Sequence, residues 1–114
     1  MNKEKTSPKV LKDLRNDLDR RAFLKKYAKS LKGPAKIAIF VFSILKDQNQ
    51  SISSDEIKNR WNNVTSILGK YNPAYLVRAR EYGFLKEDET KKRHYKLTNN
   101  WFGRLTRKYH FSPK

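Results

Sequence analysis

The feature that most constrains the fold is the apolar run from Ala35 to Leu45, which is hydrophobic on nearly every side. A helix of this kind has to be covered from more than one direction, because it has no polar face to leave in water. Its β-branched residues would also suit a strand. Pro34 at its start, its length, and the polar run that follows it over residues 46–50 favour a buried helix. The rest of the chain must therefore supply elements that surround this segment.

Two apolar stripes at helical spacing precede this run and predict a helical extension over residues 9–33. The stripes consist of Leu11, Leu14 and Leu18, and then of Leu24, Tyr27, Ala28 and Leu31. The phase changes near residues 19–21, so one bent helix and two short helices are both open. Gly33 is expected to end the extension in a left-handed conformation, with Pro34 starting the next helix. Residues 1–8 are polar and lysine-rich, which favours a disordered tail.

Capping residues divide the second half of the chain into further elements. Ser51-Ile52 is expected to form a short strand, and the Ser-x-x-Glu pattern from Ser53 to Glu56 predicts a helix start. Apolar residues at helical spacing continue this helix from Ser54 to Leu68, and Gly69 ends it. Asn72 as cap and Pro73 as the first helical residue begin the next helix, which Gly83 ends.

A hairpin and a last helix are expected after Gly83. Phe84-Leu85 can pair with residues 95–97, and the charged residues 86–93 between them then form the tip. A short basic helix follows over residues 99–109, where Trp101, Phe102 and Leu105 are expected to close the core; stacking of Trp101 and Phe102 on exposed bases is the alternative. Residues 107–114 are expected to be a basic tail. The predicted fold is a single domain, mainly α with a small β-hairpin.

The charge of the chain indicates an anionic partner. Lys and Arg number 27 against 11 Asp and Glu, a net charge of +16, which far exceeds what solubility needs. Residues 1–33 and residues 71–114 each hold eleven basic and four acidic residues, whereas residues 34–70 are nearly neutral. Nucleic acid is the partner that this distribution favours, with an acidic membrane surface or an acidic protein as alternatives.

Several classes of function lack the residues that they need. The chain has no Cys, and His94 and His110 have no partner at metal-ligand spacing. No phosphate-binding glycine loop, nucleophile elbow or converging carboxylate pair occurs, so we expect neither an enzyme nor a cofactor. The apolar run is too short to span a bilayer, and no signal peptide precedes it. We expect a cytoplasmic protein.

The order of helix, short strand, helix, turn, helix and hairpin resembles a winged helix-turn-helix domain over residues 34–106, with residues 9–33 as an N-terminal helical extension. The stretch from Ala79 to Leu85, together with Lys96-Leu97-Thr98, Gly103 and Leu105, is similar to the exits of the recognition helix and the wing in many bacterial and archaeal regulators. These include the multiple-antibiotic-resistance (MarR) and PadR-like groups. The helix from Ser54 to Leu68 departs from them because it is longer than the usual second helix.

The resemblance implies that residues 72–82 form a recognition helix and residues 87–93 the wing. Leu76 and Ala79 would face the core, leaving Tyr75 and Arg78, with Ala74 and Tyr82 as further candidates, outward. Arg78 could then bond to a guanine edge and Tyr75 contact a phosphate or a thymine methyl, unless both are ordinary surface residues, with Arg78 paired to Glu81 or Tyr82. The remaining candidate DNA contacts are Asn72 and Arg80 on the helix, Lys91, Lys92 and Arg93 at the tip, and Lys25 and Lys29 on the N-terminal helix.

These features predict a double-stranded DNA-binding protein, most simply a small sequence-specific transcriptional regulator. The apolar run and the leucine stripe further suggest a homodimer that contacts two half-sites. An architectural, replication or plasmid-maintenance factor with little sequence preference is the alternative, as is an RNA-binding or protein-interaction winged helix. The lysines of the N-terminal helix could equally serve only to keep that helix soluble.

Overall fold

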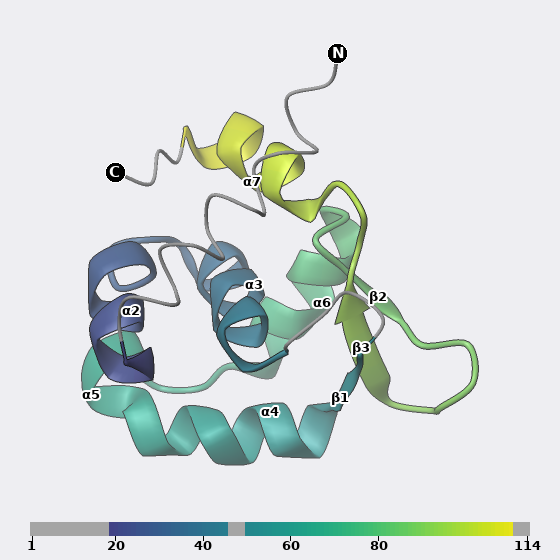
Figure 1. Ribbon diagram of the computed structural model, residues 1–114, viewed down its shortest axis with the longest axis horizontal. Coiled ribbons are helices and arrows are strands. Elements are labelled where there is room, and N and C mark those ends of the chain that lie inside the picture. Colours follow the sequence, from purple (N-terminus) through teal and green to yellow (C-terminus); the bar gives the residue numbers. More distant parts are fainter. Residues whose placement is uncertain (1–18, 46–49, 111–114) are drawn as a thin grey trace.

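Helix α3 (Gly33–Ile44) lies at the centre of the computed structural model of this chain, which describes residues 19–45 and 50–110. Ala35 and all residues from 37 to 43 are buried. The elements that pack around α3 are α2 (Arg20–Tyr27), α6 (Pro73–Glu81), β3 (His94–Leu97) and α7 (Trp101–Tyr109) (Figure 1). The predicted buried helix is confirmed and the strand alternative is wrong. Because one chain covers α3 on every side, α3 itself gives no reason for a twofold partner.

Helix α2 begins where the sequence changes phase. The Asp19 carboxylate accepts a hydrogen bond of 2.7 Å from the backbone N–H of Ala22 and so caps the helix. The prediction that Gly33 ends this helix in a left-handed conformation is wrong. The helix ends at Tyr27, six residues earlier, because the chain must turn back for α2 to pack on α3; Gly33 has no positive φ and is the first residue of α3. Leu11, Leu14, Leu18 and the expected tail over residues 1–8 lie outside the described residues.

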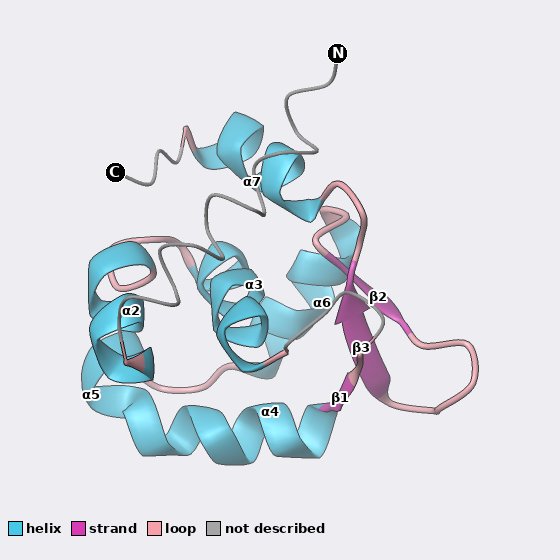
Figure 2. Ribbon diagram, viewed as in Figure 1, coloured by secondary structure: helices cyan, strands magenta, loops and turns pink. Residues whose placement is uncertain are grey.

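Three short strands form an antiparallel sheet in the order β1-β3-β2 (Figure 2). Strand β2 (Leu85–Glu87) pairs with β3 so that Leu85 faces Leu97 and Glu87 faces Tyr95, which confirms the predicted hairpin. Strand β1 (Ile52–Ser53) pairs with the other edge of β3, one residue later than the predicted Ser51-Ile52. The fold is therefore mainly helical with a small β-sheet, as the sequence predicts.

The predicted continuous helix from Ser54 to Leu68 is wrong. The structure divides it into α4 (Ser54–Trp61), the 3₁₀ turn η2 (Asn62–Val64) and α5 (Thr65–Leu68). Adjacent asparagines are poor helix formers, and the Trp61 Nε1–H donates a 2.8 Å hydrogen bond to the carbonyl of Gly69, which draws the end of the segment back. The predicted stop at Gly69 is confirmed by its φ of 84°.

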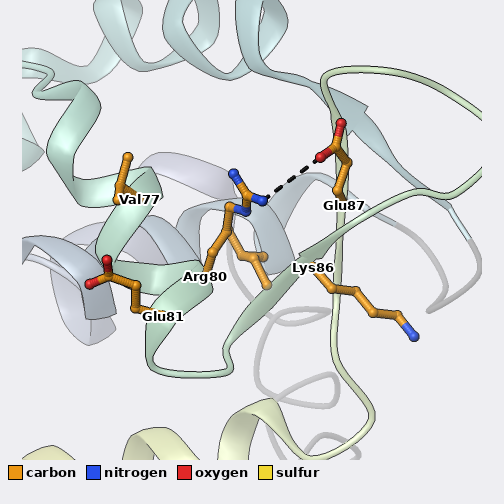
Figure 3. A pocket seen from close by; sticks show the side chains of 6 residues that line it. Val77, Arg80, Glu81, Lys86 and Glu87 are labelled. Atoms are coloured by element: carbon orange, nitrogen blue, oxygen red, sulfur yellow. Dashed lines mark ion pairs between the residues drawn. The ribbon is translucent and has the colours of Figure 1, made fainter.

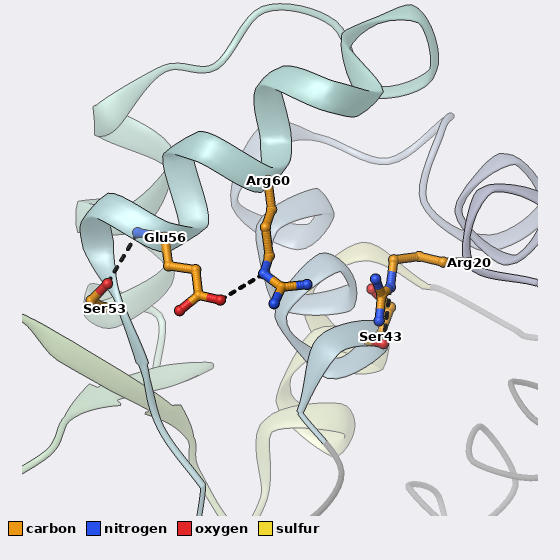
Figure 4. A network of polar contacts seen from close by, with 5 residues as sticks. All are labelled: Arg20, Ser43, Ser53, Glu56 and Arg60. Carbon is orange, nitrogen blue, oxygen red and sulfur yellow. Dashed lines mark hydrogen bonds and ion pairs between the residues drawn. The ribbon is translucent and has the colours of Figure 1, made fainter.

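Polar side chains bond to the backbone at the start of α4 and at the end of α3. Ser53 caps α4 by accepting a 3.0 Å hydrogen bond from the Glu56 N–H, as predicted, and the Glu56 carboxylate pairs with Arg60 Nε at 2.8 Å (Figure 4). Arg20 on α2 donates to the carbonyl of Ser43 at the end of α3, at 3.3 Å. The bonds from Ser53 and Arg20 thus give partners to a backbone N–H and a backbone carbonyl that have none within their own helices.

The core is completed from the C-terminal side by α7. Trp101 is fully buried and Phe102 is only 4 % exposed. The Trp101 ring centroid lies 5.4 Å from that of Phe42 on α3. Core packing of these two rings is thus confirmed, and the alternative that they stack on exposed bases is wrong because no face of either ring is open to a base.

Candidate nucleic-acid interface

Helix α6 has the local structure that its capping residues predict. The side-chain oxygen of Asn72 accepts a 2.9 Å hydrogen bond from the Ala74 N–H, and Pro73 is the first helical residue. Gly83, with a φ of 83°, ends the helix. Asn72 is exposed, but its oxygen is used in this cap, so among the predicted DNA contacts it has a structural role of its own.

One face of α6 packs on α3 and the opposite face is open to solvent. Leu76 and Ala79 are buried, as predicted. The exposed residues of the outward face are Ala74, Val77, Arg78 and Glu81. Val77 is 50 % exposed and is the large hydrophobic side chain left at the surface in the described part of the chain. Val77 was not among the residues predicted from the sequence to face outward, although a helical wheel that places Ala79 inward places Val77 on the opposite side.

Arg78 lies on this outward face without an acidic partner. It is exposed, and no ion pair involves it within the described ranges, so the alternative pairing with Glu81 is not what the structure has. A guanidinium in this state keeps all of its donors for an external acceptor. Of the predicted contacts on α6, Arg78 is the one that the structure leaves free.

Tyr75 does not point outward, and that prediction is wrong. Its ring is half-buried, lies 6.0 Å from the Trp61 ring centroid, and covers Gly33 so closely that a Cβ at Gly33 would clash with Cε1, Cδ1 and Cζ of the ring. Tyr82 is half-buried as well, with its ring centroid 5.9 Å from that of Phe84. Both tyrosines flank α6 and brace it, because each finds a neighbouring ring on which to bury its apolar surface.

Arg80 is directed toward the hairpin (Figure 3). Its Nη2 lies 3.8 Å from Oε1 of Glu87, and its guanidinium lies 5.3 Å from the centroid of the Tyr95 ring. An open groove of about 460 Å³ separates α6 from β2, with Val77 and Glu81 on one side and Lys86 on the other. Arg80 therefore joins the helix to the sheet, and the predicted contact with a phosphate backbone would compete with these two interactions.

The acidic residues before the hairpin tip organise its backbone. Oδ1 of Asp88 accepts hydrogen bonds from the Thr90 N–H at 2.9 Å and from its hydroxyl at 2.8 Å, and these bonds lower the pKa of Asp88 to about 2. Oε2 of Glu87 accepts the N–H of Arg93 at 3.1 Å, where the backbone is left-handed with a φ of 61°. Of the three carboxylates here, those of Glu87 and Asp88 thus bind the turn, and Glu89 is the third.

The cations of the tip are left exposed by this arrangement. Lys91, Lys92 and Arg93 are all exposed, and the carbonyl of Arg93 accepts a 2.8 Å bond from the Ser54 N–H that fixes the tip to the start of α4. The tip thus presents three positive side chains from a backbone held at both ends. Glu87, predicted to belong to the wing loop, is the last residue of β2.

Lys25 on α2 and Lys29, two residues after its end, are both exposed, and α2 lies at the opposite end of the long axis from the hairpin (Figure 1). Helix α2 packs on α3 and α5. Arg21 holds it to η2 and α5 by donating to the carbonyl of Asn63 at 3.2 Å and to the Ser66 hydroxyl at 3.1 Å. The structure does not bring the two lysines together with Arg78 and the hairpin tip.

Neither a metal centre nor a membrane helix is formed by the described residues. Residues 19–45 and 50–110 contain no group of three His, Cys, Asp or Glu side chains that could hold a metal ion. None of their helices combines the length and the apolar character needed to cross a bilayer. His94 contacts the carbonyl of Lys92 through Nδ1 at 3.0 Å, so it takes part in the hairpin turn.

Comparisons with known proteins give no match for this chain, whether with protein-family models, curated proteins or solved structures. A function for this chain therefore has to rest on the geometry and charge of its own side chains.

Proposed function

We propose that this chain binds double-stranded DNA, with α6 in the major groove and the hairpin tip against the phosphate backbone. The observation that carries the proposal is the outward face of α6, where Arg78 lies unpaired beside the apolar side chains of Ala74 and Val77, in a fold whose hairpin tip presents three further exposed cations. An α-helix is about 10–12 Å wide and fits a major groove of about 12 Å. The order of elements from α3 to β3 is also that of the winged helix-turn-helix domain that the sequence resembles.

The outward face of α6 has the chemistry to discriminate between bases. Arg78 can donate two hydrogen bonds to O6 and N7 of guanine, and Val77 with Ala74 can contact the methyl group of thymine. Glu81, the one carboxylate on this face, can accept from N4 of cytosine but would repel a phosphate. This mixture favours a sequence-specific regulator, because an outward carboxylate would only weaken a surface that binds DNA through its phosphates alone.

The net charge of +16 supports a second candidate, an architectural or replication factor that binds DNA with little sequence preference. Phosphate contacts dominate the affinity of such a protein. The two candidates differ in a measurable ratio, since specific binding exceeds non-specific binding by at least about 10³.

A homodimer is part of the regulator proposal. With α3 covered within one chain, it rests on the stripe of Leu11, Leu14 and Leu18 and on the twofold symmetry common in regulators of this kind. Sedimentation equilibrium at micromolar concentration, with and without DNA, tests it directly. A monomer under both conditions would remove the dimer from the proposal and leave single-site binding.

Selection of bound sequences from a random duplex library, at about physiological salt, tests the function. An enriched motif supports the specific regulator, and two copies about one helical turn apart support the dimer. A flat result with tight and steeply salt-dependent binding supports the architectural factor. Absence of duplex binding contradicts both candidates, and single-stranded RNA would then be the next ligand to measure.

Two single variants locate the interface once a bound duplex is known. Arg78→Ala is expected to weaken the selected duplex by about 1–3 kcal/mol and to relax preference at one base pair, whereas Lys92→Ala should weaken all duplexes similarly and lower the salt slope by about 1. Lys58→Ala, on the exposed side of α4, is the control for loss of one positive charge. Equal effects of all three would place the interface elsewhere.

A further inference from the structure

Three cations gather where the end of α6 meets α7. Lys108 Nζ lies 4.1 Å from the centroid of the Tyr82 ring. Arg104 lies over Gly83 so closely that a Cβ at Gly83 would be 2.9 Å from its Cδ. We call Arg78, Arg104 and Lys108 the α6–α7 cluster. Their proximity could not be predicted from the sequence, because the whole hairpin separates Arg78 from Lys108 along the chain.

Two tyrosines connect the members of the cluster. Tyr109 packs with its ring centroid 6.2 Å from that of Phe84, next to Tyr82. Burial raises the pKa of the Tyr109 hydroxyl, the Tyr82 hydroxyl raises it further, and the positive charge of Arg78 opposes both. Arg78 lies one helical turn before Tyr82, whose N–H donates to the Arg78 carbonyl at 2.9 Å, so the Arg78 side chain leaves α6 on the same side as Tyr82 and away from Arg80.

The three cations of the cluster have no carboxylate partner among the described residues. Arg60 and Arg80 each face a glutamate, whereas no ion pair involves Arg78, Arg104 or Lys108 in the described part of the chain. Like charges placed together repel, and an anion bound between them would remove the repulsion. Contact with an aromatic ring also restricts the Lys108 side chain beforehand, which lowers the entropy lost on binding.

We propose that Arg104 and Lys108 bind backbone phosphates of duplex DNA alongside Arg78, so that α7 forms a second backbone contact across α6 from the hairpin tip. This inference rests on the proposed function. Arg78 belongs both to the outward face of α6 and to the cluster, so a DNA strand that Arg78 reaches passes next to Lys108. Side chains that flank a groove helix from a neighbouring element contact phosphates, because they cannot reach the base edges.

The test compares two double variants that remove the same charge from opposite sides of the molecule. Arg104→Gln with Lys108→Gln removes the proposed contacts from α7, and Lys58→Gln with Arg60→Gln removes two exposed cations of α4, which lies across the core from α7 (Figure 1). All four side chains are exposed, so both variants should fold, which thermal unfolding by circular dichroism verifies. Binding of a fluorescent duplex of about 20 base pairs is measured by anisotropy between 50 and 300 mM salt.

Loss of two phosphate contacts should reduce the slope of log K against log[salt] by about 1.8 and weaken binding about 60-fold at 0.1 M salt. The α4 pair should change the slope by much less. Equal slopes for the two variants would overturn the inference and leave the proposed function standing. If the unsubstituted chain binds no duplex at any salt concentration, the proposed function fails and the inference with it.

Discussion

Gly33→Ala provides a sharp test of how α6 is held against α3. Gly33 is the first residue of α3, has no positive φ, and is covered by the ring of Tyr75 from the start of α6. The backbone would therefore accept alanine without strain, and alanine is ordinarily the better helix residue. The alanine side chain cannot be accommodated, however, because its Cβ would clash with the Tyr75 ring.

The expected free-energy change has opposite signs in two backgrounds. In the unsubstituted chain, Gly33→Ala should lower the free energy of unfolding by about 1–3 kcal/mol, the usual cost of forcing an extra carbon into a packed site. In the Tyr75→Ala background the ring is absent, and the same change should raise it by about 0.5 kcal/mol through the lower entropy of the unfolded chain. The two substitutions should thus couple by about 1.5–3.5 kcal/mol.

Urea unfolding followed by the fluorescence of Trp61 and Trp101 measures all four members of this cycle. With an m-value of about 2 kcal/mol/M, Gly33→Ala alone should lower the midpoint by about 0.5–1.5 M. The double variant should unfold at or above the midpoint of Tyr75→Ala. An equal loss in both backgrounds would show that the Tyr75 ring is not the obstacle, and would refute the packing described for the start of α6.

Three further outcomes are expected. Tyr27→Phe should leave stability unchanged or raise it by up to about 1 kcal/mol in thermal unfolding, because the buried Tyr27 hydroxyl has no hydrogen-bond partner among residues 19–45 and 50–110; a clear loss would contradict this. The Asp88 carboxyl should titrate by NMR with a pKa of about 2. Its folded pKa is depressed, so its stabilising effect is present above the unfolded pKa and is lost as the pH falls toward 2. Thr90→Val should raise that pKa only in part, because the Thr90 N–H remains; an unchanged pKa would exclude the hydroxyl bond. Glu87→Ala should weaken duplex binding in anisotropy, although it removes a negative charge, because Glu87 bridges Arg80 and the N–H of Arg93; tighter binding would contradict that role.

Elements governed by local backbone chemistry could be predicted from the sequence. Asn72 and Pro73 begin α6, Gly83 ends it, and Ser53 caps α4, because each of these residues acts on the backbone within a few positions of itself. The hairpin follows from the alternation around Tyr95 in the same way. Arg78, the central member of the candidate interface, could be placed on the outward side because helical periodicity fixes which residues lie opposite Leu76 and Ala79.

The sequence by itself thus determined the start of α4, both ends of α6, the hairpin, the burial of the apolar run over residues 35–45, and the large excess of positive charge. Tertiary structure alone decided the direction of Tyr75, the engagement of Arg80 with Glu87, and the meeting of Lys108 with Tyr82. The physical reason is the range of the interactions. Caps and periodicity act between near neighbours in sequence, whereas a flanking side chain takes whichever contact the folded chain brings beside it.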